Sequence, residues 1–203
     1  MNQPQQKNKK YALKFCILGD GGVGKTTLVE RLATGNFNPI TKMTIGIDFS
    51  LIHLDIQLNL EESISIDLTV WDLGGEDRFR FMLPAYIHGA DGGILLYDVT
   101  RFTSAMNLPG WLKMWRSNTD PGTPIYLVGS KFDLVTENMY PMVEQNITSL
   151  KEELGMKIHF LISTKDGIMI EDLMQTIAKE MWIFKNRAQT TPSPYKFEYK
   201  LRV

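Results

Sequence analysis

The sequence predicts an α/β fold with a mostly parallel sheet that carries helices on both of its faces. The first observation is that apolar runs typical of buried strands alternate along the chain with segments of helical spacing. The second is a glycine-rich segment, GDGGVGKT, which stands at residues 19–26 between the first such strand and the first such helix. Ligands of this fold class bind at the carboxyl ends of the strands, so we expect the functional motifs to follow the strands.

The predicted elements follow one another in this alternating order. The strands are expected at residues 11–19, 47–58, 64–72, 92–99, 125–129 and 157–163. The helices are expected at residues 27–33, 103–118, 142–154 and 170–184. A polar, turn-like segment separates the second and third strands, which predicts a hairpin. The alternation of the second strand changes phase near Leu51 and Ile52, which indicates either a β-bulge or a strand covered on both faces over part of its length.

Composition limits the class of protein. The 203 residues suit one domain, which we place at residues 11–186 between a polar N-terminal tail (1–10) and a C-terminal tail (187–203). The net charge of −1 gives no general attraction to nucleic acid, so no such partner is expected. The single cysteine, Cys16, excludes an intramolecular disulfide and is expected to be buried and inert. A membrane span, a secretory signal and lipid-attachment motifs are not visible, so we expect a cytoplasmic protein.

The segment GDGGVGKT fits the phosphate-binding pattern G-x-x-x-x-G-K-[ST], and strand, loop and helix are the setting that this P-loop needs. Gly21, Gly22 and Gly24 allow backbone conformations in which successive N–H groups point inward around an anion. Lys25 would reach the β- and γ-phosphates, and the Thr26 hydroxyl would hold Mg²⁺. The alternative is a glycine-rich turn that binds nothing. The motif alone does not distinguish ATP from GTP, or a hydrolase from a kinase.

The motif WDLGGED begins at Trp71, where a predicted strand ends. Asp72 follows four alternating apolar residues and can hold Mg²⁺ through a coordinated water. The N–H of Gly75 can approach the γ-phosphate because no side chain blocks it. The alternative for D-x-x-G is a simple turn.

Two short motifs follow later strands and point to guanine. In SKFD, the carboxylate of Asp133 can accept from both the N1–H and the 2-amino group of guanine, a donor pair that adenine lacks. The aliphatic stem of Lys131 would lie along the base. In the segment Ser163-Thr164-Lys165, a backbone N–H could meet the guanine O6 atom.

With these motifs in order, the chain resembles the small GTPases of the Ras superfamily, and in pattern the Rab group most of all. GDGGVGKT, Thr44, DLGG, SKFD and STK match the five guanine-nucleotide motifs of that family in order. The segments TIGIDF (44–49) and WDLGGEDRFR (71–80) are similar to Rab sequences, and the resemblance spans roughly residues 11–184. It implies a P-loop NTPase fold with a six-stranded sheet, one of whose strands is antiparallel, surrounded by five helices.

The resemblance also implies roles that spacing does not give. Thr44 would coordinate Mg²⁺ and sense the γ-phosphate, and Phe37 would pack edge-on against guanine. The segments 35–47 and 73–86 would be the two switch regions, which order around the γ-phosphate and relax after hydrolysis. Phe49, Trp71 and Tyr86 match an aromatic triad read by protein partners, for which ordinary core packing is the alternative.

The resemblance then defines the complete set of expected site residues. The nucleotide would contact Gly19, Asp20, Gly21, Gly22, Val23, Gly24, Lys25, Thr26, Thr27, Phe37, Thr44, Gly75, Ser130, Lys131, Asp133, Ser163, Thr164 and Lys165. The Mg²⁺ ion would be held by Thr26, Thr44 and, through water, Asp72. The catalytic residues would be Glu76, Lys25, Thr44 and Gly75.

Three positions of the expected site depart from the family pattern. Glu76 stands where the family usually has a glutamine that orients the attacking water, and a carboxylate cannot donate to a phosphate oxygen. We therefore expect slow intrinsic hydrolysis. Ser130 replaces the usual asparagine, which predicts a weakened link between its loop and the P-loop and faster nucleotide exchange. Thr41 stands where many relatives have a tyrosine that covers the nucleotide, which predicts a more open site. The first switch segment contains no arginine, so a partner is expected to supply any arginine finger.

The C-terminal tail lacks the usual lipid-carrying cysteines, which puts a lipid-anchored role in doubt and leaves peripheral membrane association open. Its last residues, YKFEYKLRV, alternate apolar and polar side chains as a strand does. Such a strand could pair with a sheet edge in this chain or on a partner, and a disordered tail is the alternative.

We conclude from the sequence that the chain is a GTP-hydrolysing molecular switch that uses GTP/GDP and Mg²⁺. It would act as a monomer on protein effectors and regulators, with pairing through the tail as a further possibility. One alternative is a nucleotide-dependent interaction module with negligible hydrolysis, which Glu76 favours. A second is a small-molecule kinase, which would need an acceptor pocket and a basic lid that the sequence does not show.

Overall fold

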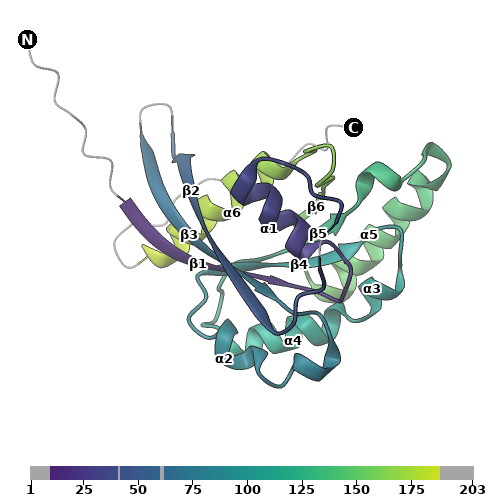
Figure 1. Ribbon diagram of the computed structural model, residues 1–203, viewed down its shortest axis with the longest axis horizontal. Helices are drawn as coiled ribbons and strands as arrows, with labels where there is room; N and C mark the ends of the chain where they lie inside the picture. The colour runs from purple at the N-terminus through teal and green to yellow at the C-terminus, as the bar shows by residue number, and fades with distance from the viewer. Residues whose placement is uncertain (1–9, 41, 60–61, 188–203) are drawn as a thin grey trace, which may run out of the picture.

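A computed structural model describes residues 10–40, 42–59 and 62–187, and it contains one six-stranded sheet with the strand order β2-β3-β1-β4-β5-β6 (Figure 1). The strands are β1 (Lys10–Leu18), β2 (Ile47–Gln57), β3 (Ser63–Leu73), β4 (Gly92–Asp98), β5 (Ile125–Ser130) and β6 (His159–Leu161). β2 pairs with β3 antiparallel, and every other neighbouring pair is parallel. The predicted hairpin and the mostly parallel sheet are therefore confirmed.

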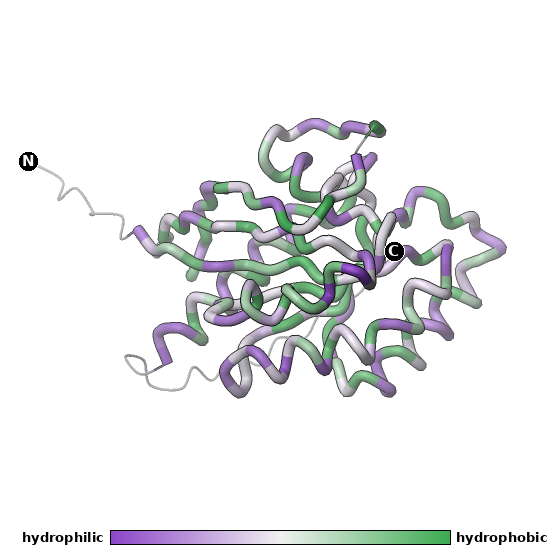
Figure 2. The backbone as a smooth tube through the Cα atoms, turned by 60° about the horizontal axis from the view of Figure 1, so that its bottom comes forward, coloured by the Kyte–Doolittle hydropathy of each residue, from purple (hydrophilic) through white to green (hydrophobic). Residues whose placement is uncertain are grey.

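Helices cover both faces of this sheet. They are α1 (Lys25–Thr34), α2 (Leu83–Ile87), α3 (Thr103–Met106), α4 (Leu108–Asn118), α5 (Tyr140–Leu154) and α6 (Ile170–Lys185). One hydrophobic core lies between the sheet and the pair α1 and α6, and a second lies between the opposite face and α2, α4 and α5. Figure 2 colours the backbone by hydropathy, and the central strands in it are mostly apolar.

The two central strands fix the position of the loops that follow them. Every residue of β4 is buried, and the second half of β1 from Phe15 is fully buried. Alternate side chains of β1 enter the two cores: Phe15 and Ile17 enter one, Cys16 and Leu18 the other. Since burial of one such apolar side chain contributes about 1.5–3 kcal/mol, the carboxyl ends of these strands are firmly held.

The interpretation of β2 as bulged or covered on both faces was wrong. Its pairing with β3 runs one to one without interruption, from Ile47 opposite Leu73 to Gln57 opposite Ser63. The phase change arises because apolar residues lie on both faces of an edge strand. Ile52 enters the core, whereas Leu51 on the opposite face is 57% exposed.

The helix predicted over residues 103–118 is two helices, α3 and α4, separated at Asn107. Pro109 lies in the first turn of α4 and has no N–H to donate to the carbonyl of Ala105, so one helical hydrogen bond is missing at the junction. With α2 also present, the described residues contain six α-helices rather than five. The other predicted elements are present, with ends that shift by one to two residues.

In the part of the chain that the structure describes, no helix has both the length and the apolar character needed to cross a membrane.

Candidate functional site

The P-loop connects the end of β1 to the start of α1, as its sequence pattern predicts. Gly22 and Gly24 have positive φ angles of 76° and 97°, a region that side chains with a Cβ rarely occupy. At Gly19 a Cβ would lie only 2.1 Å from the carbonyl oxygen of Leu96 in β4, so no larger residue fits there. The glycines therefore shape the loop and let it pack tightly against the neighbouring strand.

Lys25 folds back over this loop. Its Nζ atom donates to the carbonyl oxygens of Gly19 and Asp20, at 2.9 Å each. The residue is only 6% exposed, and burial lowers the pKa of its ammonium group to about 8, although the carboxylate of Asp72 opposes this shift. A buried ammonium group beside the backbone N–H groups of a P-loop is suited to bind a phosphate.

The three expected Mg²⁺ ligands meet in space although they are far apart in sequence. The hydroxyls of Thr26 and Thr44 are 2.7 Å apart, and both donate to Oδ2 of Asp72, at 2.5 Å and 3.0 Å. Thr26 lies in the first turn of α1, Asp72 near the end of β3, and Thr44 before β2.

The chemistry of this cluster fits a hard divalent cation. Oδ1 of Asp72 is buried and has no hydrogen-bond partner among the described residues. Burial raises the pKa of this carboxyl group, against the hydrogen bond from Thr26 and the charge of Lys25. Two hydroxyls and one carboxylate are the oxygen donors that Mg²⁺ accepts when phosphates and water complete its coordination.

The two predicted switch segments touch each other and the P-loop. The N–H of Gly74 donates to the carbonyl of Gly46 at 2.8 Å, and a Cβ on Gly74 would lie 2.6 Å from that oxygen. A Cβ on Gly75 would lie 2.4 Å from both the carbonyl carbon of Asp20 and the nitrogen of Gly21. These two glycines thus permit a backbone approach that any other residue would prevent.

The predicted guanine-binding segments also converge. Oγ of Ser163 donates to Asp133 at 2.7 Å, which joins the loops after β5 and β6. Lys131 donates to the carbonyl of Gly22 at 2.9 Å and pairs with Asp98 at 2.7 Å.

Ser130 is the position at which the sequence predicted a weakened link to the P-loop. Its hydroxyl lies 2.7 Å from the carbonyl of Val23 and 2.9 Å from that of Tyr97, so this residue does join β5 to the P-loop. The residue itself is buried.

Other predicted residues lie at the margin of the cluster. The carboxylate of Glu76 accepts from Nε of Arg78, two residues along the chain. Thr164 is buried, and the carbonyl of Lys165 accepts from Arg31 in α1 at 3.3 Å. Phe37 is partly buried in the segment that follows α1. The predictions for Thr41 and for a strand in the C-terminal tail fall outside the described residues.

The aromatic triad forms a continuous strip. The ring centroids of Phe49 and Trp71 are 5.8 Å apart, as are those of Trp71 and Tyr86. Phe49 is 66% exposed, whereas Trp71 and Tyr86 pack against the core formed with α2 and α4. Core packing, the alternative role for the triad, therefore applies to Trp71 and Tyr86 but not to Phe49.

Sequence reasoning missed a set of polar contacts around the P-loop. The carboxylate of Asp20 accepts from Trp111 at 2.8 Å, from Asn107 at 2.7 Å and from Arg80 at 3.3 Å. Arg101 donates to the carbonyl of Gly21 at 2.7 Å. Asn107, Trp111 and Arg101 lie outside the short motifs, at the junction before α4, in α4 and in the loop after β4. Arg80 ends the motif WDLGGEDRFR, which assigned it no role.

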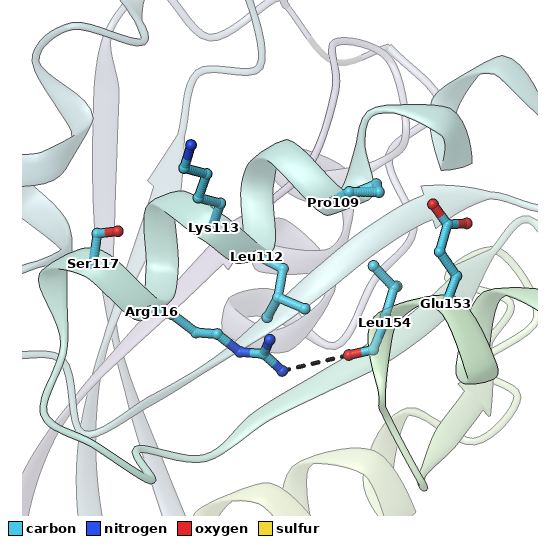
Figure 3. Close-up of a pocket in the computed structure, with 7 residues that line it drawn as sticks. All are labelled: Pro109, Leu112, Lys113, Arg116, Ser117, Glu153 and Leu154. Atoms are coloured by element: carbon cyan, nitrogen blue, oxygen red, sulfur yellow. Dashed lines mark hydrogen bonds between the residues drawn. The ribbon is translucent and has the colours of Figure 1, made fainter.

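A separate shallow pocket lies between α4 and α5 (Figure 3). Arg116 reaches across it to the carbonyl of Leu154, at 3.4 Å. Its lining residues are Pro109, Leu112, Lys113, Arg116, Ser117, Glu153 and Leu154. None of them belongs to the predicted site, so the pocket is distinct from the P-loop cluster.

The fold and this cluster together define a P-loop protein, and comparison with known proteins gives the family. A family model described as the Ras family matches residues 14–183. The chain is 34% identical over 171 residues to Ras-related protein Rab-13 of Bos taurus, and these residues make up 84% of this chain and 80% of that protein. It is 30% identical over 200 residues to Ras-related protein RABA5c of Arabidopsis thaliana, covering 98% and 89%. It is 32% identical over 179 residues to Ras-related protein RGP2 of Oryza sativa subsp. japonica, covering 87% and 78%.

The chain therefore belongs to the Ras family and is Rab-like, as its motifs predicted. As a small GTPase of that family, it is a GTP-binding switch protein.

Proposed function

We propose that this protein binds GTP and Mg²⁺ at the P-loop cluster and hydrolyses GTP slowly when no partner is present. The observation that carries this proposal is the convergence of Thr26, Thr44 and Asp72, with a buried oxygen of Asp72 that lacks a partner among the described residues. We assign this site to a domain at residues 11–186. The matched range 14–183 supports that assignment.

Different residues of the cluster would bind the phosphates, the guanine base and Mg²⁺. The backbone of the P-loop and Lys25 would hold the β- and γ-phosphates, and Asp133 would select guanine. Mg²⁺ would neutralise phosphate charge, held by the hydroxyls of Thr26 and Thr44 and, through water, by Asp72. The N–H of Gly75 would meet the γ-phosphate, since Gly75 already lies against Asp20 and Gly21 of the P-loop.

Slow hydrolysis follows from the chemistry of Glu76. A glutamine at this place accepts from the attacking water and donates to a phosphate oxygen, whereas a carboxylate can only accept. In the structure Glu76 pairs with Arg78. This contact supports the proposal that the side chain of Glu76 does not position the attacking water.

Single-turnover hydrolysis of GTP tests this assignment. We expect Glu76→Gln to accelerate hydrolysis about tenfold or more over the wild type, while leaving the affinity for GDP unchanged. The nucleotide that copurifies with the wild type should be identified first, because GDP or GTP is expected. A variant rate equal to or below that of the wild type would show that Glu76 is no handicap.

A second candidate function is an interaction module that binds GTP with negligible hydrolysis. The observation that favours it, besides Glu76, is the amount of exposed apolar surface on the switch segments. Ile40, Met43, Ile45 and Phe81 are all exposed there. Turnover assays with and without cell extract separate the two functions, since a switch should be accelerated by an activating protein and an inert module should not.

A further inference from the structure

Arg101 lies on the loop between β4 and α3, where the sequence predicted no site residue. One of its Nη atoms donates to the carbonyl of Gly21 at 2.7 Å. Both Nη atoms lie 3.8 Å from the position that a Cβ on Gly22 would take. Its guanidinium group is therefore placed directly against the P-loop backbone.

The contact falls at a particular end of the P-loop. Lys131, from the guanine-binding segment, donates to the carbonyl of Gly22, whereas Arg101 donates to that of Gly21. Gly21 also lies against Gly75, the residue expected at the γ-phosphate. Lys131 thus marks the guanine end of the loop, and Arg101 lies toward the γ-phosphate end.

The backbone beneath Arg101 is firmly anchored. Its N–H donates to the carbonyl of Asp98 at 3.0 Å, and its carbonyl accepts from both the N–H and the hydroxyl of Ser104, at 2.9 Å and 2.7 Å. Ser104 is fully buried, whereas Arg101 itself is exposed. The backbone of Arg101 is therefore fixed, and its exposed side chain extends from it to the P-loop.

The electrostatics of this region favour a polyanion. Arg101 takes part in no ion pair with any of the described residues. Lys25 donates to the carbonyls of Gly19 and Asp20, which adjoin the Gly21 carbonyl that Arg101 contacts. Two cations thus face the same stretch of P-loop, and the phosphates of a nucleotide would neutralise both.

We propose that Arg101 contacts the γ-phosphate of bound GTP and so supplies, from this chain, the cationic group that the first switch segment lacks. The inference rests on the proposed binding of GTP at the P-loop. During hydrolysis the oxygen of water bonds to the γ-phosphorus, and the bond to the β–γ bridging oxygen breaks with its electron pair on GDP. Both protons of the water stay on the released phosphate, which departs as dihydrogen phosphate. The guanidinium group stabilises the negative charge that develops on the transferred group.

Nucleotide affinity separates this role from simple support of the P-loop. For Arg101→Gln we expect about tenfold weaker binding of a non-hydrolysable GTP analogue with Mg²⁺, and less than about twofold weaker binding of GDP. Equal losses for both nucleotides would show that Arg101 only supports the loop, and no loss for either would also overturn the proposal. Lys113→Gln, which removes the same charge from an exposed position on α4, is the matched control and should match the wild type.

Two further readouts complete the test. The ³¹P resonance of the γ-phosphate in the complex with the GTP analogue should shift in Arg101→Gln, while that of the α-phosphate stays in place. Single-turnover hydrolysis should slow about tenfold or more, and Arg101→Lys should not restore it because a point charge lacks the planar donor pair. An unshifted γ-phosphate resonance with an unchanged rate contradicts the proposal. If wild-type protein fails to bind the GTP analogue at all, the proposed function itself has failed.

Discussion

At the scale of single residues, Ser130 shows how one small side chain joins the P-loop to the sheet. Its hydroxyl is buried between the carbonyls of Val23 and Tyr97. A hydroxyl carries a single proton, so it donates to one of these carbonyls at a time. When the proton goes to Val23, a buried hydrogen bond joins the P-loop to the end of β5.

Replacing this hydroxyl tests the link directly. We expect Ser130→Ala to reduce the free energy of unfolding by about 1–2 kcal/mol, because a buried carbonyl loses its donor. We also expect GDP to dissociate about five- to tenfold faster, since the loop that holds the phosphates is less firmly fixed. Stopped-flow dissociation of a fluorescent GDP and urea unfolding measure the two effects. Ser117→Ala, at an exposed position on α4, is the control, and an unchanged dissociation rate would refute the link.

At the scale of elements, the edge strand β2 carries apolar side chains on both faces. The face that includes Ile52 and Ile56 fills the core beneath α1 and α6, while Phe49 and Leu51 remain largely exposed on the other face. Phe49 continues across β3 into Trp71 and Tyr86. Exposed aromatic surface beside two switch segments is typical of a site for protein partners.

Paired substitutions in the aromatic strip distinguish binding surface from core. Phe49→Ala should change the free energy of unfolding by less than about 1 kcal/mol, because the side chain is mostly exposed. Trp71→Ala should cost about 3 kcal/mol or more, because this ring packs between its neighbours and the core. Urea unfolding at fixed nucleotide concentration gives both values. Equal losses for the two variants would mean that Phe49 is a structural residue.

At the scale of the whole molecule, two separate cores pack on one sheet, and a part-buried polar pair joins two of its strands. Tyr97 of β4 and His159 of β6 are joined by a hydrogen bond of 3.0 Å between the phenol oxygen and Nε2. Burial lowers the pKa of His159 to about 3 from its ordinary value of 6.5, and the charge of Lys151 adds to this effect. Folding therefore keeps this imidazole neutral.

The lowered pKa of His159 predicts that the protein loses stability in mild acid. Between about pH 6.5 and pH 3 the unfolded chain binds a proton at His159 that the folded chain does not bind, so stability falls as the pH falls. We expect the protonation of His159 in the unfolded chain to reduce the free energy of unfolding by about 2 kcal/mol when the pH is lowered from 7.5 to 5. Urea titrations at the two pH values should show a smaller difference for His159→Gln. The same difference in the variant and the wild type would contradict this assignment.

The sequence predictions were correct where the structure depends on neighbouring residues in the chain. The alternation of Ile64, Ile66 and Leu68 is local, and it correctly predicted a half-buried strand. The order of the motifs after the strands also predicted that Thr26 and Asp72 lie together, whereas the place of Thr44 beside them was implied by the resemblance to the Ras superfamily. Contacts decided by tertiary packing could not be predicted in this way.

The contacts of Asp20 illustrate that limit. Its partners Asn107 and Trp111 lie at and after the junction that divides the predicted helix, and both reach the P-loop from there. Nothing in the local sequence around Arg101 indicates that its side chain extends to Gly21. Likewise, the exposure of Leu51 follows from the position of β2 at the edge of the sheet.

The hydrogen bond from Gly74 to Gly46 has a consequence for the proteins that bind this chain. It joins the two switch segments through their backbones, so a partner that stabilises one segment in this arrangement also stabilises the other. By thermodynamic linkage the effect is reciprocal: if a ligand of the first segment strengthens binding at the second by some factor, a ligand of the second strengthens binding at the first by the same factor. Two partners that share this arrangement thus bind cooperatively without touching each other.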